Sequence, residues 1–164
     1  MQSVRIEQRL EQLGLVLPAA TQAPPGVRLP FTPVRVRGNR AYVAGHGPLQ
    51  PDGSLAGPFG SVGAELSIEQ GYAAARLTCL SMLGSLARAL GDLDRISAWL
   101  RVFGMVRCAP GFGQEPAVIN GCSDLILELF GPEIGQHARS AVGLADLPFN
   151  LPVEIEAEVE IATG

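Results

Sequence analysis

The segment Val153–Ile161 constrains the fold more than any other, because apolar and acidic residues alternate along it without interruption. Successive side chains of a β-strand point to opposite faces of a sheet, so one face of this segment is apolar and the other is acidic. The apolar set is Val153, Ile155, Ala157, Val159 and Ile161, and the acidic set is Glu154, Glu156, Glu158 and Glu160. The pattern predicts a sheet with one buried face. Four like charges on the other face repel one another, so they require water, basic neighbours or a functional site.

Helical periodicity and capping residues predict two long helices and one short helix, over residues 67–91, 111–131 and 6–14. The first long helix opens with a capping box of Ser67 and Gln70 and closes at Gly91. Pro116 suits the first turn of the second long helix. The two long helices are expected to lie against the sheet, and the short one is an additional element.

Alternation and β-branched residues predict a hairpin turning at Gly38-Asn39, and further strands over residues 96–109, 138–147 and 153–161. The predicted order of elements is β-β-α-β-α-β-β after a short N-terminal helix. This order favours an α+β fold, a mixed sheet with two helices packed on one face. We expect residues 1–28 to form the N-terminal helix and a connector, and residues 29–164 to form a single domain.

Charge and composition argue against several classes of function. The formal net charge is −4 and no basic cluster of five or more residues occurs, so the electrostatic footprint of a nucleic-acid-binding protein is missing. All 12 basic residues are arginines, and the absence of lysine excludes Schiff-base lysines and the P-loop lysine. No apolar stretch approaches the roughly 20 residues of a membrane-spanning helix. With no signal-peptide pattern in the first residues, we expect a cytoplasmic protein without a membrane partner.

The cysteines, histidines and short motifs indicate no metal, cofactor or nucleophile site. Cys79, Cys108 and Cys122 are odd in number and widely spaced, which favours buried thiols over disulfides or zinc ligands. His46 and His137 have no serine or cysteine recognisably beside them, so structural roles are favoured for both. The HExxH, CxxC, GxGxxG and GxSxG patterns are absent. We therefore expect neither a metal nor a cofactor.

Arg139 stands in a strand that otherwise contains alanine, glycine, serine and small aliphatic residues. Small neighbours leave room for a ligand, and the planar guanidinium suits a carboxylate held by two parallel hydrogen bonds. From the residues alone, a salt bridge with a C-terminal glutamate is an equal alternative. We also hypothesise that some alternating arginines meet these glutamates across strands or across a subunit interface, namely Arg35, Arg37, Arg101 and Arg107.

The run HARSAVGLADLPFNLPVEIEAEVEI, residues 137–161, resembles the closing signature of the Rid family, the YjgF-like reactive-intermediate deaminases that are also labelled endoribonuclease L-PSP. The shared features are an Ala-Arg-Ser core, a Leu-Pro pair and a Val-Glu-Ile-Glu strand. GNRAYVAGHGPL is similar to the family's strand and turn, and AVINGCSDLILELFG is similar to its second helix with an early asparagine. The resemblance covers roughly residues 29 to 162, and the opening helix resembles the family's longer subgroup.

This resemblance implies a chorismate-mutase-like fold, a homotrimer with ligand clefts between subunits, and no cofactor. It implies hydrolysis of reactive enamines and imines, the 2-imino acids, to 2-keto acids and ammonia. Arg139 would bind the carboxylate of this small metabolite, and Glu154 would place or polarise the attacking water. The other positions that the resemblance assigns to substrate binding are Asn120, Phe31, Ala44 and Gly45.

Several residues depart from the family pattern. Phe31 stands where active members often carry tyrosine, Ala44 replaces a turn serine, His46 replaces a glutamine and Ala141 replaces a cysteine. The arginine and the glutamate are retained while the surrounding hydroxyl groups are lost. Two further functions therefore stay open: a non-catalytic protein that binds carboxylate metabolites or regulates, and, less favoured because of the acidic charge, an endoribonuclease.

Overall fold

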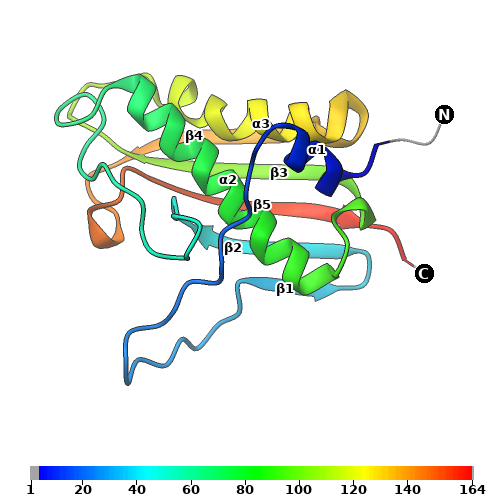
Figure 1. Cartoon of the computed structure of the whole chain (residues 1–164). Helices are drawn as coiled ribbons and strands as arrows, with labels where there is room; N and C mark the ends of the chain where they lie inside the picture. The colour runs from blue at the N-terminus through cyan, green and yellow to red at the C-terminus, as the bar shows by residue number, and fades with distance from the viewer. Residues whose placement is uncertain (1–3, 164) are drawn as a thin grey trace.

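A computed structural model describes residues 4–163, and the elements follow the predicted order (Figure 1). The helices are α1 (Ile6–Gln12), α2 (Ile68–Leu90) and α3 (Glu115–Gly135). The strands are β1 (Val34–Arg37), β2 (Arg40–His46), β3 (Ile96–Arg107), β4 (Ala138–Leu144) and β5 (Val153–Ile161). Short 3₁₀ turns occur at Leu93–Arg95 and Pro148–Asn150.

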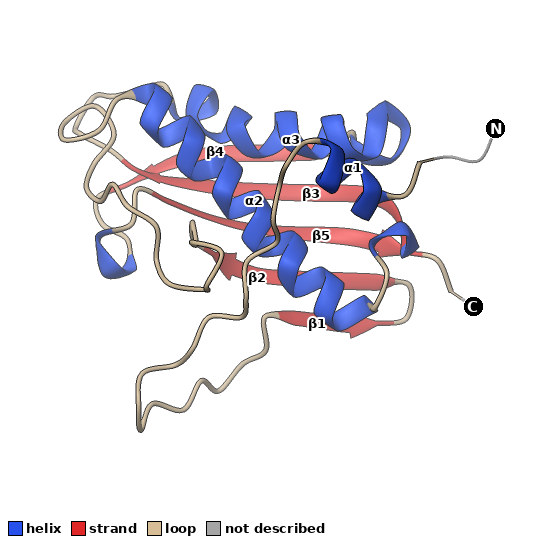
Figure 2. Cartoon of the chain, in the orientation of Figure 1, coloured by secondary structure: helices blue, strands red, loops and turns tan. Residues whose placement is uncertain are grey.

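The five strands form one mixed sheet in the order β1-β2-β5-β3-β4. All neighbours are antiparallel except β3 and β4, which run parallel and are joined by α3 as a crossover. Helices α2 and α3 cover one face of the sheet, and we call the opposite face the open face (Figure 2). The predicted α+β class is therefore confirmed.

Strand β5 lies in the middle of the sheet, and its alternation matches its burial. Val153, Ile155, Val159 and Ile161 are buried beneath the helices, while the four glutamates lie on the open face. The core also includes Trp99 of β3, whose ring meets Phe130 of α3 edge to face.

Close backbone contacts bring α3 onto α2 and onto the sheet. A Cβ atom at Gly121 of α3 would lie 2.1 Å from the carbonyl oxygen of Tyr72 in α2. A Cβ atom at Gly104 of β3 would lie 2.6 Å from Ile119 of α3. These two glycines therefore set how closely the layers approach, and α3 in turn positions the side chains that face β4.

The helix boundaries differ from the prediction at α3. The segment from 111 to 114 is loop, because Gly111 and Gly113 adopt positive φ, and the helix begins at Glu115 with Pro116 in its first turn. Gly131, at φ 74°, kinks the helix before Pro132, and one more turn follows to Gly135. The predicted start of α2 is confirmed, since Ser67 and Gln70 form the capping box.

Strand β4 and helix α1 are shorter than the patterns predicted. Strand β4 ends at Leu144, so residues 145–147 lie in the connection to β5. Leu13 is 42% exposed and caps α1, so only Ile6 and Leu10 of the predicted stripe are buried.

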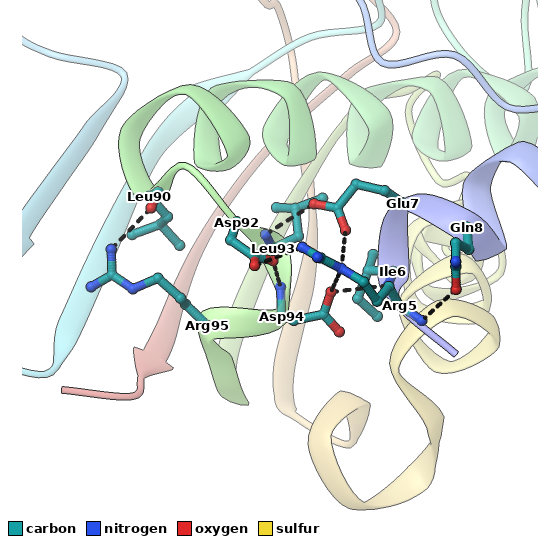
Figure 3. A network of polar contacts seen from close by, with 9 residues as sticks. All are labelled: Arg5, Ile6, Glu7, Gln8, Leu90, Asp92, Leu93, Asp94 and Arg95. Carbon is teal, nitrogen blue, oxygen red and sulfur yellow. Dashed lines mark hydrogen bonds and ion pairs between the residues drawn. The ribbon is translucent and has the colours of Figure 1, made fainter. Parts of the chain in front are cut away.

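The N-terminal helix is attached by reciprocal polar contacts with the 3₁₀ turn after α2 (Figure 3). Arg5 donates to Asp92 at 2.7 Å, and the backbone amide of Ile6 donates to Asp94 at 3.2 Å. In return, Glu7 accepts from the backbone amide of Leu93 at 3.2 Å. Each segment thus satisfies free backbone donors at the start of the other.

The connector that follows α1 crosses α2 and then extends away from the sheet before β1 (Figure 1). Arg88 of α2 donates to the carbonyl of Pro18 at 3.1 Å. Three large apolar side chains of the extended part are at least half exposed, namely Val27, Leu29 and Phe31. Within the described residues, no helix is both long enough and apolar enough to span a membrane.

Candidate functional site

Arg139 lies on the edge strand β4, directly opposite Val102 of β3. Val102 is fully buried under the helices, so the Arg139 side chain lies on the helix-covered side of the sheet. Its Nη1 atom donates to Asn120 Oδ1 at 2.8 Å and to Ser123 Oγ at 3.1 Å, and Nη2 donates to the Pro116 carbonyl at 3.4 Å. All three acceptors are neutral. None of the contacts described for Arg139 is therefore the salt bridge with a C-terminal glutamate that the sequence offered as an alternative.

The three acceptors share one stripe of helix α3. Pro116, Asn120 and Ser123 follow one another at spacings of four and three residues, which places them on the same side of a helix. Because α3 lies along the edge of the sheet, this stripe faces β4. The structure thus brings together two of the predicted site residues, Arg139 and Asn120, and adds Ser123.

Both histidines are held in hydrogen bonds, and one of them reaches the Arg139 cluster. His137 Nδ1 lies 2.7 Å from the carbonyl of Gly135, and its Nε2 lies 2.9 Å from Ser123 Oγ. His46 repeats the pattern, with Nδ1 on the carbonyl of Ala44 and Nε2 2.8 Å from Ser85 Oγ. Burial lowers the pKa of His46, which favours its neutral ring.

Glu154 lies on the open face, opposite Met105 of β3. A β-bulge between Val43 and His46 brings the backbone of β2 against it, so that a Cβ atom at Gly45 would lie 3.0 Å from the Glu154 carboxyl carbon. Burial, and then the neighbouring Glu156, raise the pKa of Glu154. A raised carboxyl pKa next to a strand bulge is a common arrangement around acid–base groups.

Arg139 and Glu154 therefore lie on opposite faces of the sheet of one chain. Their partners Val102 and Met105 are an odd number of residues apart in a regular part of β3, which places them on opposite faces. Of the remaining predicted positions, Ala44 and Gly45 lie at the bulge beside Glu154. Phe31 is 62% exposed on the extended connector.

The hypothesis that arginines meet the glutamates of β5 is partly confirmed. Arg101 pairs with Glu156 at 3.9 Å, as that hypothesis expects. Arg40, which the hypothesis did not include, pairs with Glu158 at 3.9 Å. Arg107 instead pairs with Asp146 at 3.6 Å, because β3 ends there beside the connection between β4 and β5.

Two cavities open at the ends of β3 and β4, and neither is lined by Arg139 or Glu154. One, of about 420 Å³, contains Cys108 and Glu115 beside Gly143; the thiol donates to the carboxylate at 3.5 Å. The other, of about 620 Å³, is a wide depression between Arg107 and residues 146–150. Cys108 is half-buried, whereas the other two cysteines are fully buried as predicted, and all three are free thiols. Sequence reasoning identified neither cavity, because each is lined by two segments of the chain that meet only in the folded protein.

Within the described part of the chain, one acidic cluster has the spacing of metal ligands. It consists of Glu7, Asp92 and Asp94, and Arg5 already lies against all three carboxylates. The guanidinium occupies the position that a cation would take, so the cluster explains how α1 is attached rather than a metal site.

Comparison with known proteins agrees with this architecture. Residues 7–155 match the family described as "YjgF/chorismate_mutase-like, putative endoribonuclease". Protein TCP17 of Trypanosoma cruzi is 40% identical over 97% of this chain and 96% of its own length. A crystal structure from Agrobacterium tumefaciens, of unknown function, has a TM-score of 0.85 at 39% identity and covers 96% of this chain and 92% of its own. A crystal structure from Shewanella oneidensis, described as "a putative endoribonuclease", has a TM-score of 0.86 at 31% identity and covers 96% of this chain and 100% of its own.

The match to the family model covers most of the chain, and the T. cruzi relative is similar along nearly its whole length. The mixed sheet, the two covering helices and the order of elements agree with the solved structures. The chain belongs to the YjgF/chorismate mutase-like family, the family that the Arg139 and Glu154 segment resembles.

Proposed function

We propose that this protein hydrolyses 2-imino acids, or the enamines in equilibrium with them, to 2-keto acids and ammonia. The observation that carries the proposal is the state of Arg139. Its guanidinium is held by neutral acceptors only, its residue is partly exposed, and within the described residues its Nε has no hydrogen-bond partner. A positioned, uncompensated guanidinium at an edge strand of small residues suits a substrate carboxylate.

In the proposed reaction, Arg139 binds the carboxylate and a water molecule attacks the imine carbon. Glu154 takes a proton from this water and returns it to the nitrogen, and the resulting carbinolamine collapses to the 2-keto acid with loss of ammonia. The raised pKa of Glu154 supports this role, because a carboxylate with a pKa nearer neutrality accepts a proton more readily. The protein's main contribution is to hold the substrate in place and to stabilise developing charge.

A single chain separates the two groups by the thickness of its sheet, so the proposed site also requires a second copy. We place it in a cleft between subunits of a homotrimer, where Arg139 of one copy meets Glu154 of the next. The open face supports this assembly, since Phe103, Met105 and Leu144 are partly exposed there and Val142 is 37% exposed. Apolar side chains gathered on an uncovered sheet face are typical of subunit interfaces.

The test generates an imine with an amino-acid oxidase and follows its decay with the wild type and with Arg139→Ala. The proposal expects the wild type to accelerate the decay and Arg139→Ala to lose most of this acceleration. Arg37→Ala, which removes an exposed arginine of β1, serves as a matched control for loss of one positive surface charge. Decay at the buffer rate with both the wild type and Arg139→Ala would rule out the deaminase.

A non-catalytic binding protein is the second candidate, because Phe31, Ala44 and Ala141 lack the groups common in active members. It predicts that small 2-keto acids raise the melting temperature of the wild type but not of Arg139→Ala, without turnover of any imine. The endoribonuclease activity in the family description is disfavoured by the net charge of −4. Absence of RNA binding at low salt would exclude it.

A further inference from the structure

A chain of hydrogen bonds runs from the Arg139 guanidinium through Ser123 and His137 to the backbone carbonyl of Gly135. His137 Nδ1 faces the carbonyl of Gly135 at 2.7 Å, and a carbonyl can only accept, so Nδ1 carries the hydrogen. In the neutral ring, Nε2 is then an acceptor, and the Ser123 hydroxyl donates to it at 2.9 Å. With its hydrogen committed, Ser123 Oγ presents lone pairs to Arg139 Nη1 at 3.1 Å.

These contacts determine which edge of the guanidinium is free. Nη1 has two hydrogens, and one is donated to Asn120 and the other to Ser123. Nη2 donates one hydrogen to Pro116, at the longer distance of 3.4 Å. Among the described residues, the Nε hydrogen and one Nη2 hydrogen have no acceptor. When Pro116 takes the Nη2 hydrogen on the Nη1 side, the two that remain lie side by side on the edge that suits a bidentate carboxylate.

We infer that Ser123 and His137 are positioning residues, which orient Arg139 so that its Nε–Nη2 edge receives the substrate carboxylate. The inference rests on the proposed function, since it concerns the same arginine and the same ligand group. It adds two residues that touch no substrate and act only through Arg139. Asn120 fixes one hydrogen of Nη1, and Ser123, itself oriented by His137, fixes the other.

The chain contains a second relay of the same construction, which provides an internal comparison. His46 Nε2 faces Ser85 Oγ at 2.8 Å, and Arg88 Nη2 donates to Ser85 Oγ at 3.3 Å. There the arginine also donates to the Pro18 carbonyl, so this relay fastens the N-terminal connector to α2. Both arginines also donate to a backbone carbonyl, and the two relays differ in location: Arg88 ties the distant connector to α2, whereas Arg139 stands on the edge strand β4 among small residues that leave room for a ligand.

The experiment compares Ser123→Ala with Ser85→Ala, which removes the same hydroxyl from the other relay. Steady-state kinetics with an oxidase-generated imine, and calorimetric titration with a 2-keto acid, measure KM, kcat and Kd. We expect Ser123→Ala to raise KM and Kd about tenfold, the effect of losing roughly one hydrogen bond to a charged group, with kcat within about twofold. Ser85→Ala is expected to leave all three within about twofold and to lower the melting temperature only.

Variants at His137 test the relay without touching Ser123. His137→Phe removes the acceptor and should reproduce the effect of Ser123→Ala, whereas His137→Gln keeps an acceptor and should restore most of the affinity. The double variant of Ser123→Ala and His137→Phe should be no weaker than either single variant, because both changes break one relay. Should Ser123→Ala fold poorly, the Phe and Gln variants give the same comparison.

The outcomes separate this inference from the proposed function. If Ser123→Ala and His137→Phe match Ser85→Ala in KM and Kd while Arg139→Ala loses binding, the relay is only structural and the proposed function survives. If Arg139→Ala binds and turns over substrate like an active wild type, Arg139 does not hold the carboxylate and the relay has no ligand to serve; if the wild type itself does not accelerate imine decay, the proposed function fails.

Discussion

A single carboxyl group, that of Glu154, carries a cost to folding that its proposed role explains. Burial and the neighbouring Glu156 raise its pKa above the ordinary value of 4.5, so the folded state disfavours its charged form. The contribution of Glu154 to the free energy of unfolding therefore decreases as pH rises. Below pH 4.5 the group is protonated in both states and costs nothing, and stability is lost as pH rises through the higher folded-state pKa.

Glu154→Gln should therefore be more stable than the wild type at neutral pH, while losing hydrolysis. The difference in denaturation midpoint between the two should be largest near pH 8 and should vanish towards pH 4. Glu133→Gln, at an exposed position on α3, is the control and should show no such pH-dependent difference. Equal midpoints for Glu154→Gln and the wild type at pH 8 would contradict the burial argument.

At the scale of elements, the close crossing of α2 and α3 is the most sensitive feature of the helical layer. A Cβ atom at Gly121 would meet the backbone carbonyl of Tyr72 at 2.1 Å, and a backbone atom cannot move aside as a flexible side chain can. Gly121→Ala should cost about 1–3 kcal/mol of stability despite alanine's better helix propensity. Because the same helix carries Asn120 and Ser123, the shift should also weaken 2-keto acid binding.

Chemical denaturation with a matched variant on the same helix checks this prediction. Leu127→Ala changes a side chain that is 39% exposed and should cost much less. A denaturation midpoint for Gly121→Ala equal to that of the wild type would show that α2 and α3 can separate without loss.

The elements differ in how far the sequence alone predicted them. The alternation in β5 correctly predicted its faces, because side-chain periodicity is a local property of a strand. The place of β5 between β2 and β3, and the parallel pairing of β3 with β4, depend on contacts between distant segments that periodicity does not encode.

The candidate site shows the same limit. The sequence singled out Arg139 from its small neighbours and Asn120 from a family motif. For His137 it predicted a structural role but identified no hydrogen-bond partner. Ser123 lies 14 residues earlier in the chain, and the two meet only because α3 folds back along β4. The three-residue step from Asn120 to Ser123 was the one available signal, since it places both side chains on one helical face.

At the scale of the whole molecule, the opposite placement of Arg139 and Glu154 leads to a prediction about assembly. If each cleft combines Arg139 of one subunit with Glu154 of its neighbour, two inactive variants can complement each other. Trimers assembled at random from equal amounts of Arg139→Ala and Glu154→Gln would contain both native residues in about a quarter of their clefts. Co-expressed variants should therefore recover about a quarter of the wild-type activity, whereas each variant alone should have almost none.

The control mixes the two purified variants without exchange of subunits, which should give no recovery, and native mass spectrometry verifies that the co-expressed oligomers are mixed. Complementation separates a shared cleft from a site within one chain, because a site built from a single subunit would be broken in every copy of both variants. Mixed trimers without activity, formed from variants that each fold and assemble normally, would therefore contradict the cleft between subunits. Recovery would in turn explain why one chain places Arg139 and Glu154 on different faces of the same sheet.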